Sequence, residues 1–304
     1  MVLAVNKSLG VNLTLLLIAV IWGAGFIPQK LGMDYVGPAA FNALRFALGA
    51  LTLIPVMLIM RSFALKDVLD TGSFKLGLVL GFLLFAGALF QQISLQYTSV
   101  ANVSFITGLY VIVVPLIGYF VGYRYGLIVW SGGVLAIIGL YLMTAGGLPG
   151  MLKGDLIALA GAVMWAIHLL VIAERAGGFN QIALSFIQFL SCAVLSLGIA
   201  YFFEDQILPT DMKGYLWPLI NGVIVVGFAY TLQVLVMPHA EPFSASVILS
   251  LEAVFGAIAG YLVFDESKTM MALLGAVLML CGCLLAQLQH GKKSLQETTS
   301  SRFS

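Results

Sequence analysis

Long apolar runs dominate this chain and constrain its fold more than any other feature of the sequence. They are about 20 residues long, the length that an α-helix needs to cross roughly 30 Å of hydrocarbon. Hydrophobic residues make up 61% of the chain and charged residues only 9%, whereas soluble domains carry about 25% charged residues. So little polar surface cannot cover a water-soluble globule. The sequence therefore predicts a polytopic, all-α membrane protein.

Ten apolar runs can be counted along the 304 residues, and each is expected to form one transmembrane helix. The connections are too short for a separate soluble domain, and the polar residues 290–304 are expected to form a disordered tail. The expected spans are residues 12–31, 38–60, 74–95, 99–121, 125–145, 154–173, 182–203, 214–236, 241–264 and 270–289.

The distribution of Lys and Arg between the connections predicts the orientation in the membrane. Positively charged connections tend to stay in the cytoplasm, and the side that holds both termini is the richer in basic residues. Both termini are therefore expected in the cytoplasm. The basic residues on that side are Lys7, Arg61, Lys66, Lys75, Arg124, Arg175, Lys292, Lys293 and Arg302, against Lys30, Lys153, Lys213 and Lys268 on the other.

Several classes of function are disfavoured by the composition and by missing motifs. A net charge of +1 gives no basic patch for nucleic acid. Cys192, Cys281 and Cys283 lie in apolar runs, so we expect buried small side chains and neither a disulfide nor a metal site. The chain has no G-x-x-x-x-G-K-[ST] phosphate loop and no H-E-x-x-H zinc motif. No cofactor is expected.

An internal repeat relates the two halves of the chain. A shift of about 143 residues brings Trp22 onto Trp165, and a shift of 142 brings Gln91 onto Gln233. Each half holds five spans, and because five is odd the second half must enter the membrane in the opposite orientation. Such inverted repeats place the substrate between the halves. The two predicted repeats are residues 12–145 and 154–289.

Glu252 and Arg45 are charged residues inside predicted spans. A charge near the bilayer centre costs roughly 2.5–3.5 kcal/mol, so such residues usually face protein or water. Gly256 and Gly260 follow Glu252 on one helix face, and these small residues predict close packing with Glu252 pointing into the bundle. Two alternatives remain open. Glu252 takes up and releases a proton, or it forms a structural ion pair with Arg45.

Uncharged polar residues on several predicted spans form a second set. His168 lies one turn from Trp165, which indicates either a cavity wall or a hydrogen-bonded interior histidine. Gln29, Gln91 and Gln233 either line a wetted pocket or bond neighbouring helices.

Glycines recur at corresponding positions of the last span in each half. Gly132 and Gly139 are matched by Gly275 and Gly282, which predicts close packing. Either this packing lies inside a monomer or it forms the contact of a homodimer.

Four short strings resemble the EamA-type branch of the drug/metabolite transporter superfamily, and the resemblance covers nearly the whole chain except the tail. The most specific string is Leu-Glu-Ala-Val-Phe, which has a Gly-Tyr pair downstream. The strings are IWGAGF at 21–26, NALRF at 42–46, FITGLY at 105–110 and LSLEAVF at 249–255.

The resemblance implies a ten-helix transporter of the bacterial inner membrane, in a family whose members typically export amino acids, metabolites or drugs. Helices one, three, four, six, eight and nine surround the cavity in the family fold. The solute does not carry over, because the scaffold is shared across many solutes. The residues implied near the path are Trp22, Gln91, Tyr110, Trp165, His168, Gln233 and Glu252.

These features predict a secondary transporter that works by alternating access, with a small-molecule solute as its partner and protons as the hypothetical coupling ion. An apolar, aromatic pocket favours amino acids or amphipathic compounds over phosphorylated sugars, which call for clustered Lys and Arg. An uncoupled uniporter is the alternative within transport. A membrane-embedded lipid enzyme, with Glu252 and His168 as acid and base, is the alternative from another class.

Overall fold

The structure is a computed structural model that describes residues 2–59, 65–144, 152–266, 269–287 and 292–293. It consists almost wholly of helices, which satisfy their backbone hydrogen bonds within one segment, as a bilayer requires. Eight helical segments are long and apolar enough to cross a membrane. Two shorter apolar segments, Leu127–Gly139 and Leu273–Gly282, complete the ten predicted spans.

The first half of the chain contains five spans, one of which is divided into two helices by a tight turn. They are α1 (Val2–Gly32), α2 (Pro38–Ile59), α4 (Thr71–Ser94), the pair α5 (Val100–Gly108) and α6 (Tyr110–Phe120), and α7 (Leu127–Thr144). A short helix, α3 (Leu65–Leu69), precedes α4, and the strand β1 (Tyr123–Arg124) precedes α7.

The second half repeats this plan. Its spans are α8 (Leu152–Arg175), α9 (Gln181–Phe203), the run α10 (Met212–Ile220), η2 (Asn221–Tyr230) and α11 (Thr231–Val236), the pair α12 (Pro242–Leu249) and α13 (Glu252–Val263), and α14 (Met270–Gln287). The short 3-10 turns η1 (Ala176–Gly178) and η3 (Met237–His239) connect spans, and β2 (Lys292–Lys293) follows α14.

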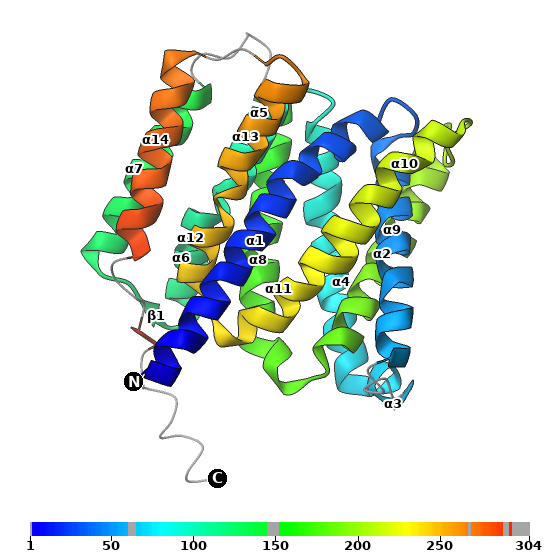
Figure 1. Cartoon of the computed structure of the whole chain (residues 1–304), viewed down its shortest axis with the longest axis horizontal. Helices are drawn as coiled ribbons and strands as arrows, with labels where there is room; N and C mark the ends of the chain where they lie inside the picture. The colour runs from blue at the N-terminus through cyan, green and yellow to red at the C-terminus, as the bar shows by residue number, and fades with distance from the viewer. Residues whose placement is uncertain (1, 60–64, 145–151, 267–268, 288–291, 294–304) are drawn as a thin grey trace.

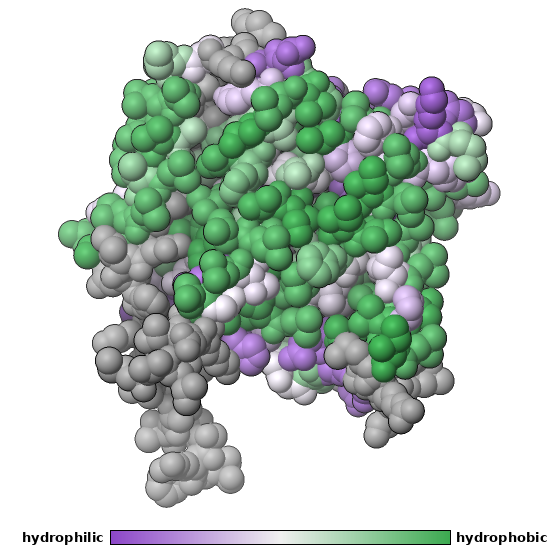
Figure 2. All heavy atoms as spheres, in the orientation of Figure 1, coloured by the Kyte–Doolittle hydropathy of each residue, from purple (hydrophilic) through white to green (hydrophobic). Residues whose placement is uncertain are grey.

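The spans lie side by side and run between two opposite ends of the molecule (Figure 1). Hydrophobic side chains cover most of the visible flank, and hydrophilic ones gather along its upper and lower edges (Figure 2). Large apolar residues of the spans are exposed, among them Phe120 at 85% and Phe203 at 79%. These side chains are therefore expected to contact the lipid chains, where an exposed apolar surface is favourable.

Carboxylates from connections of the second half cap helices of the first half. Glu204, between α9 and α10, accepts hydrogen bonds from the backbone N–H groups of Ala39 (2.7 Å) and Ala40 (2.9 Å) at the start of α2. Glu266 does the same at the start of α5, at 2.7 and 3.0 Å. Each carboxylate satisfies N–H groups that a helix start leaves free and lies at the positive end of the helix dipole. These contacts hold the two halves together.

The matched glycines of α7 and α14 pack against one another inside the chain. A Cβ atom at Gly139 would lie 2.5 Å from the backbone oxygen of Gly275, and one at Gly282 would lie 2.5 Å from that of Gly132. The two helices therefore approach at backbone distance, as Figure 1 shows for this pair. Of the two alternatives, packing inside a monomer or a homodimer contact, these glycines therefore serve packing within one copy of the chain.

Two spans contain a tight turn at equivalent positions and remain continuous helices, Val100–Phe120 and Pro242–Val263, as the sequence predicts over 99–121 and 241–264. The tight turns lie at Leu109, between α5 and α6, and at Ser250 and Leu251, between α12 and α13. Leu109 (φ −62°, ψ −13°) and Leu251 (φ −61°, ψ −15°) both have a right-handed helical conformation close to that of a 3-10 turn, and they stand 142 residues apart. Apolar periodicity does not detect this local change of hydrogen bonding, because the residues on both sides remain apolar.

Part of the predicted disordered tail has a partner. Lys292 and Lys293 form β2, which pairs antiparallel with β1 so that Tyr123 lies opposite Lys293. Residues 290–291 and 294–304 lie outside the described residues.

Candidate functional site

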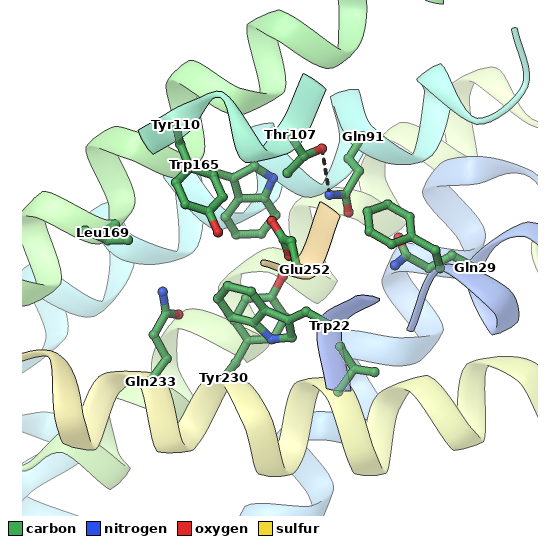
Figure 3. A pocket seen from close by; sticks show the side chains of 12 residues that line it. Trp22, Gln29, Gln91, Thr107, Tyr110, Trp165, Leu169, Tyr230, Gln233 and Glu252 are labelled. Carbon is green, nitrogen blue, oxygen red and sulfur yellow. Dashed lines mark hydrogen bonds between the residues drawn. The ribbon is translucent and has the colours of Figure 1, made fainter. Parts of the chain in front are cut away.

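A narrow pocket lies inside the bundle and is lined by residues of both halves (Figure 3). Its cavity volume is about 20 Å³, room for about one water molecule. Each lining residue is at most 7% exposed, so the pocket is shielded from the lipid-facing surface. The lining residues are Trp22, Phe26, Gln29, Gln91, Thr107, Tyr110, Trp165, Leu169, Val225, Tyr230, Gln233 and Glu252.

Most of this lining is a product of the internal repeat. Eight of the twelve residues form four pairs whose members stand 142 or 143 positions apart. The repeat therefore supplies matched side chains from opposite sides of the pocket. The pairs are Trp22 with Trp165, Phe26 with Leu169, Gln91 with Gln233, and Tyr110 with Glu252.

A tight helical turn precedes both members of the last pair. Tyr110 is the first residue of α6 and Glu252 the first of α13, so each directly follows the turn in its span. Their hydroxyl and carboxylate groups point toward one another across the pocket (Figure 3). Glu252 is 3% exposed, and its Oε1 atom has no hydrogen-bond partner among the described residues. The pocket thus contains a buried carboxylate oxygen that is open to a ligand.

Small residues bring α1 against α13 at the level of Glu252. A Cβ atom at Gly23 would lie 2.8 Å from the backbone oxygen of Glu252 and 2.8 Å from the nitrogen of Gly256. Only glycine allows this approach, which brings the neighbouring Trp22 beside the carboxylate (Figure 3). Glu252 lies inside the bundle, the direction that the small residues of its helix indicate.

Three aromatic rings form one wall of the pocket. The centroids of Trp22 and Tyr230 are 4.8 Å apart with a tilt of 38°, and those of Trp165 and Tyr230 are 5.7 Å apart and nearly parallel at 19°. The two tryptophans that the repeat relates therefore meet through Tyr230. Both indole Nε1 atoms are without a hydrogen-bond partner among the described residues.

A π-helical segment, η2, brings Tyr230 into this wall. In a π-helix the hydrogen bonds run from residue i to i+5, so that residues five apart lie on one face. Val225 and Tyr230 have this spacing and both line the pocket, whereas an α-helix would turn them apart by about 140°. Gly222 and Gly227 are also five apart, and a Cβ atom at Gly222 would lie 2.8 Å from the backbone oxygen of Arg45 on α2.

Three glutamines supply the amide groups of the pocket. Gln91 donates from Nε2 to the Thr107 hydroxyl oxygen at 3.2 Å (Figure 3). Gln29 donates to the backbone oxygen of Gly25 at 3.2 Å. The Oε1 atoms of Gln29 and Gln233 have no partner among the described residues, and the two side chains lie at opposite ends of the view in Figure 3.

Arg45 does not form the structural ion pair with Glu252 that the sequence left open. Its Nε atom donates to Asn42 Oδ1 at 2.8 Å, and its Nη1 atom donates to Asn221 Oδ1 at 3.1 Å. The guanidinium lies 4.8 Å from the centre of the Phe46 ring. Asn221 begins η2, and the close approach of η2 to α2 brings its amide oxygen to the buried cation. Arg45 is outside the pocket lining.

His168 is also outside the lining, although the sequence names it as a cavity residue. Its Nε2 atom lies 2.9 Å from Gln188 Oε1, and its ring packs edge-on against Trp165 at 5.9 Å. His168 is fully buried. It therefore lies behind Trp165 as a hydrogen-bonded interior histidine, the other of the two alternatives.

Five lining residues were not predicted from the sequence. Phe26 and Leu169 follow the two repeat-related tryptophans by four positions, a helical spacing that indicates a shared face. Thr107 precedes Tyr110 by three positions, on the other side of the tight turn at Leu109. The π-helical register hides Val225 and Tyr230 from α-helical periodicity, and the glycines five apart in η2 are the one sequence signal for them.

Two inverted five-span repeats around a buried pocket define the class of this protein, a multi-pass membrane transporter. The model of the EamA-like transporter family matches residues 9–145 and again residues 152–288. The chain therefore belongs to the EamA-like transporter family, within the drug/metabolite transporter superfamily.

Two relatives and one solved structure agree with this assignment. An uncharacterized transporter of Archaeoglobus fulgidus is 30% identical over 285 residues, covering 93% of this chain and 87% of that protein. The uncharacterized transporter YoaV of Bacillus subtilis is 24% identical over 286 residues, covering 90% of this chain and 96% of its own. A crystal structure with 19% identity superimposes with a TM-score of 0.75, covering 92% of this chain and 98% of that chain, and so shares its fold.

Proposed function

We propose that this protein is a secondary transporter that exports a small amphipathic solute by alternating access, with Glu252 coupling transport to protons. The observation that carries the proposal is the pair Tyr110 and Glu252, which occupy repeat-related positions after a tight helical turn and face one another in a pocket between the repeats. Inverted-repeat transporters place the substrate at the interface of the repeats. Export is the direction that the family resemblance implies.

The surroundings of Glu252 support a coupling role over a structural one. A carboxylate held for structure is normally paired with a cation or fully hydrogen-bonded. Here Arg45 bonds Asn42 and Asn221, and Glu252 Oε1 is without a partner among the described residues. A proton can therefore bind this oxygen without breaking an ion pair.

Alternating access also requires that the pocket open to each side in turn. The pocket is lined by both repeats, so rocking of one repeat against the other would change access at its two ends. We propose that both termini lie in the cytoplasm, that the protein spans the inner (plasma) membrane, and that a single chain contains the complete path. A homodimer remains compatible with this path.

The alternative function, a membrane-embedded lipid enzyme, requires an acid and a base that line the same site. Its acid and base would be Glu252 and His168, but His168 lies behind Trp165 and bonds Gln188. The geometry favours transport.

Counterflow in proteoliposomes tests the proposal. The purified chain is reconstituted and supplied with a labelled panel of amino acids, metabolites and amines under imposed pH gradients. We expect counterflow in the wild type and, at saturating solute, in Glu252→Gln, and accumulation driven by the pH gradient in the wild type alone. Asp205→Asn is the matched control, because it removes the same charge at an exposed position.

Two results would contradict the proposal. Normal pH-driven accumulation by Glu252→Gln would make Glu252 structural, and a uniporter without ion coupling would then be the better description. Failure of the wild type to exchange any member of the panel would argue against transport of this class of solute.

A further inference from the structure

We propose that the solute is a small organic cation: an amine whose ammonium group lies between the Glu252 carboxylate and the rings of Trp22, Trp165 and Tyr230. This inference rests on the proposed transport function and narrows its substrate class. It favours amines over the amino acids that the sequence alone suggests.

The aromatic wall is the first support. An ammonium group within about 6 Å of a ring centre is attracted by the ring quadrupole, most strongly by tryptophan. Trp22 and Trp165 flank Tyr230 at centroid distances of 4.8 and 5.7 Å. In Figure 3, Glu252 lies between the rings of Trp165 and Trp22. A cation that binds the carboxylate would therefore lie beside these rings.

The unpartnered acceptors are the second support. Glu252, Gln29 and Gln233 each have a buried Oε1 atom without a partner among the described residues. All three residues line the pocket and are 2–3% exposed. A buried acceptor without a donor is costly, and an ammonium group has three N–H donors and no acceptor. A primary amine therefore complements Glu252, whereas the Gln29 and Gln233 oxygens, at opposite ends of the pocket, are left to other donors of the solute or to water.

The charge of the lining favours amines over solutes that carry a carboxylate. Among the described residues that line the pocket, Glu252 is the one with a charged side-chain form at neutral pH, and none is Lys, Arg or His. The nearby cation, Arg45, is bonded to two asparagines outside the lining. A solute carboxylate would enter the pocket without a cationic partner, which is expensive in a buried site. An amine should therefore bind better than the amino acid with the same side chain.

The size of the pocket limits the rest of the molecule. With a cavity volume of about 20 Å³, the pocket is almost fully packed in this state, so the solute must be compact and the lining must separate to admit it. Apolar side chains such as Phe26, Leu169 and Val225 complete the lining. These features fit an ammonium group attached to one compact apolar or aromatic body.

Calorimetric titration of the purified full chain in detergent tests this inference with two matched sets of probes. Phenethylamine is compared with 2-phenylethanol and phenylalanine, and tryptamine with tryptophol and tryptophan. Each alcohol lacks the charge, and each amino acid adds a carboxylate. We expect the amines to bind about tenfold or more tightly than either counterpart, because the alcohol loses the charge interactions and the amino acid buries an unpaired anion.

Variants identify the groups responsible. Glu252→Gln should weaken amine binding by about tenfold or more while leaving alcohol binding unchanged. Trp165→Phe should weaken amine binding by about threefold, because phenylalanine has the weaker ring quadrupole. Trp217→Phe is the control, since Trp217 lies in a separate apolar cluster with Val36 and Phe41.

Equal or tighter binding of phenylalanine and tryptophan would overturn the inference, as would amine binding that is unchanged in Glu252→Gln. If Glu252→Gln does not fold, the comparison of amines with amino acids in the wild type still decides. Binding in detergent is measured without transport, so the proposed transport function and the proposed substrate class can be contradicted independently. Amine binding without exchange in liposomes would contradict transport alone, and exchange of other solutes without amine binding would contradict the substrate class alone.

Discussion

Tyr110 and Glu252 occupy equivalent positions of the two repeats, 142 residues apart, and they face one another in the pocket. Each stands directly after a tight helical turn, where the chain has the same backbone conformation. The two repeats therefore share the local geometry and differ in the chemistry of this position. One position holds a hydroxyl group and the other a carboxylate, so the two sides of the pocket differ in charge.

The ends of the pocket should be accessible from opposite sides of the membrane. Gln29 lies three residues before the end of α1, and Gln233 lies three residues before the end of α11. With cytoplasmic termini, these helix ends are on opposite sides. In a cysteine-free background, we expect Gln29→Cys to react with a membrane-impermeant maleimide from outside and Gln233→Cys from the cytoplasm.

An exposed position provides the control for this labelling. Asp205→Cys, in the connection after α9, should react from outside whatever the state of the pocket. Reaction of Gln29→Cys and Gln233→Cys from one side only would contradict alternating access along this pocket.

The contact between Arg45 and Asn221 should stabilise the crossing of α2 and η2. Removing Asn221 takes away a hydrogen bond to a buried charge, an interaction worth about 1.5–3 kcal/mol. We expect Asn221→Ala and Arg45→Met each to lower the unfolding temperature in detergent. Because both substitutions disrupt the same contact, the double variant should lose less stability than the sum of the losses in the two single variants. Strictly additive losses would show that the two side chains are not coupled.

The glycine contact between α7 and α14 should not tolerate a methyl group. Gly139→Ala and Gly282→Ala would force backbone movement and cost about 1–3 kcal/mol of stability each. Gly198→Ala is the matched control, since a Cβ atom there would have no atom within 4 Å. It should leave the unfolding temperature unchanged or raise it slightly, as alanine favours a helix. Equal effects at the three positions would contradict the close packing.

The pair Tyr123 and Glu174 should make stability sensitive to alkaline pH. Burial, and then the hydrogen bond to Glu174, raises the pKa of the Tyr123 hydroxyl well above its ordinary value of 10.0. The stabilisation is therefore complete below pH 10 and is lost as the pH rises beyond it. Thermal unfolding measured from pH 7 to 11 should show a smaller alkaline loss in Tyr123→Phe than in the wild type.

A second tyrosine limits the size of this effect. Burial and the charge of Glu241 also raise the pKa of Tyr125, so part of the alkaline loss should remain in Tyr123→Phe. Tyr215→Phe, at an exposed position on α10, serves as the control and should follow the wild type. An identical alkaline loss in Tyr123→Phe and the wild type would contradict the role of this bond.

The sequence by itself determined the ten spans, the repeat and most of the pocket lining. A bilayer admits few structures, so apolar runs of about 20 residues must become helices. The repeat then pairs Trp22 with Trp165 and Gln91 with Gln233, and the small residues after Glu252 indicate that its side chain points inward. These inferences require only the period of a helix and the length of a span.

The tertiary structure decided which partner each polar residue meets. Arg45 bonds Asn221 because η2 is a π-helix packed against α2 through Gly222, and His168 bonds Gln188 because Trp165 separates it from the pocket. The tight turns at Leu109 and Leu251 likewise leave no mark in the apolar pattern. Hydropathy predicts that a residue belongs to a helix. The rotation of that helix about its axis and its local hydrogen-bond register decide which residues the side chain contacts.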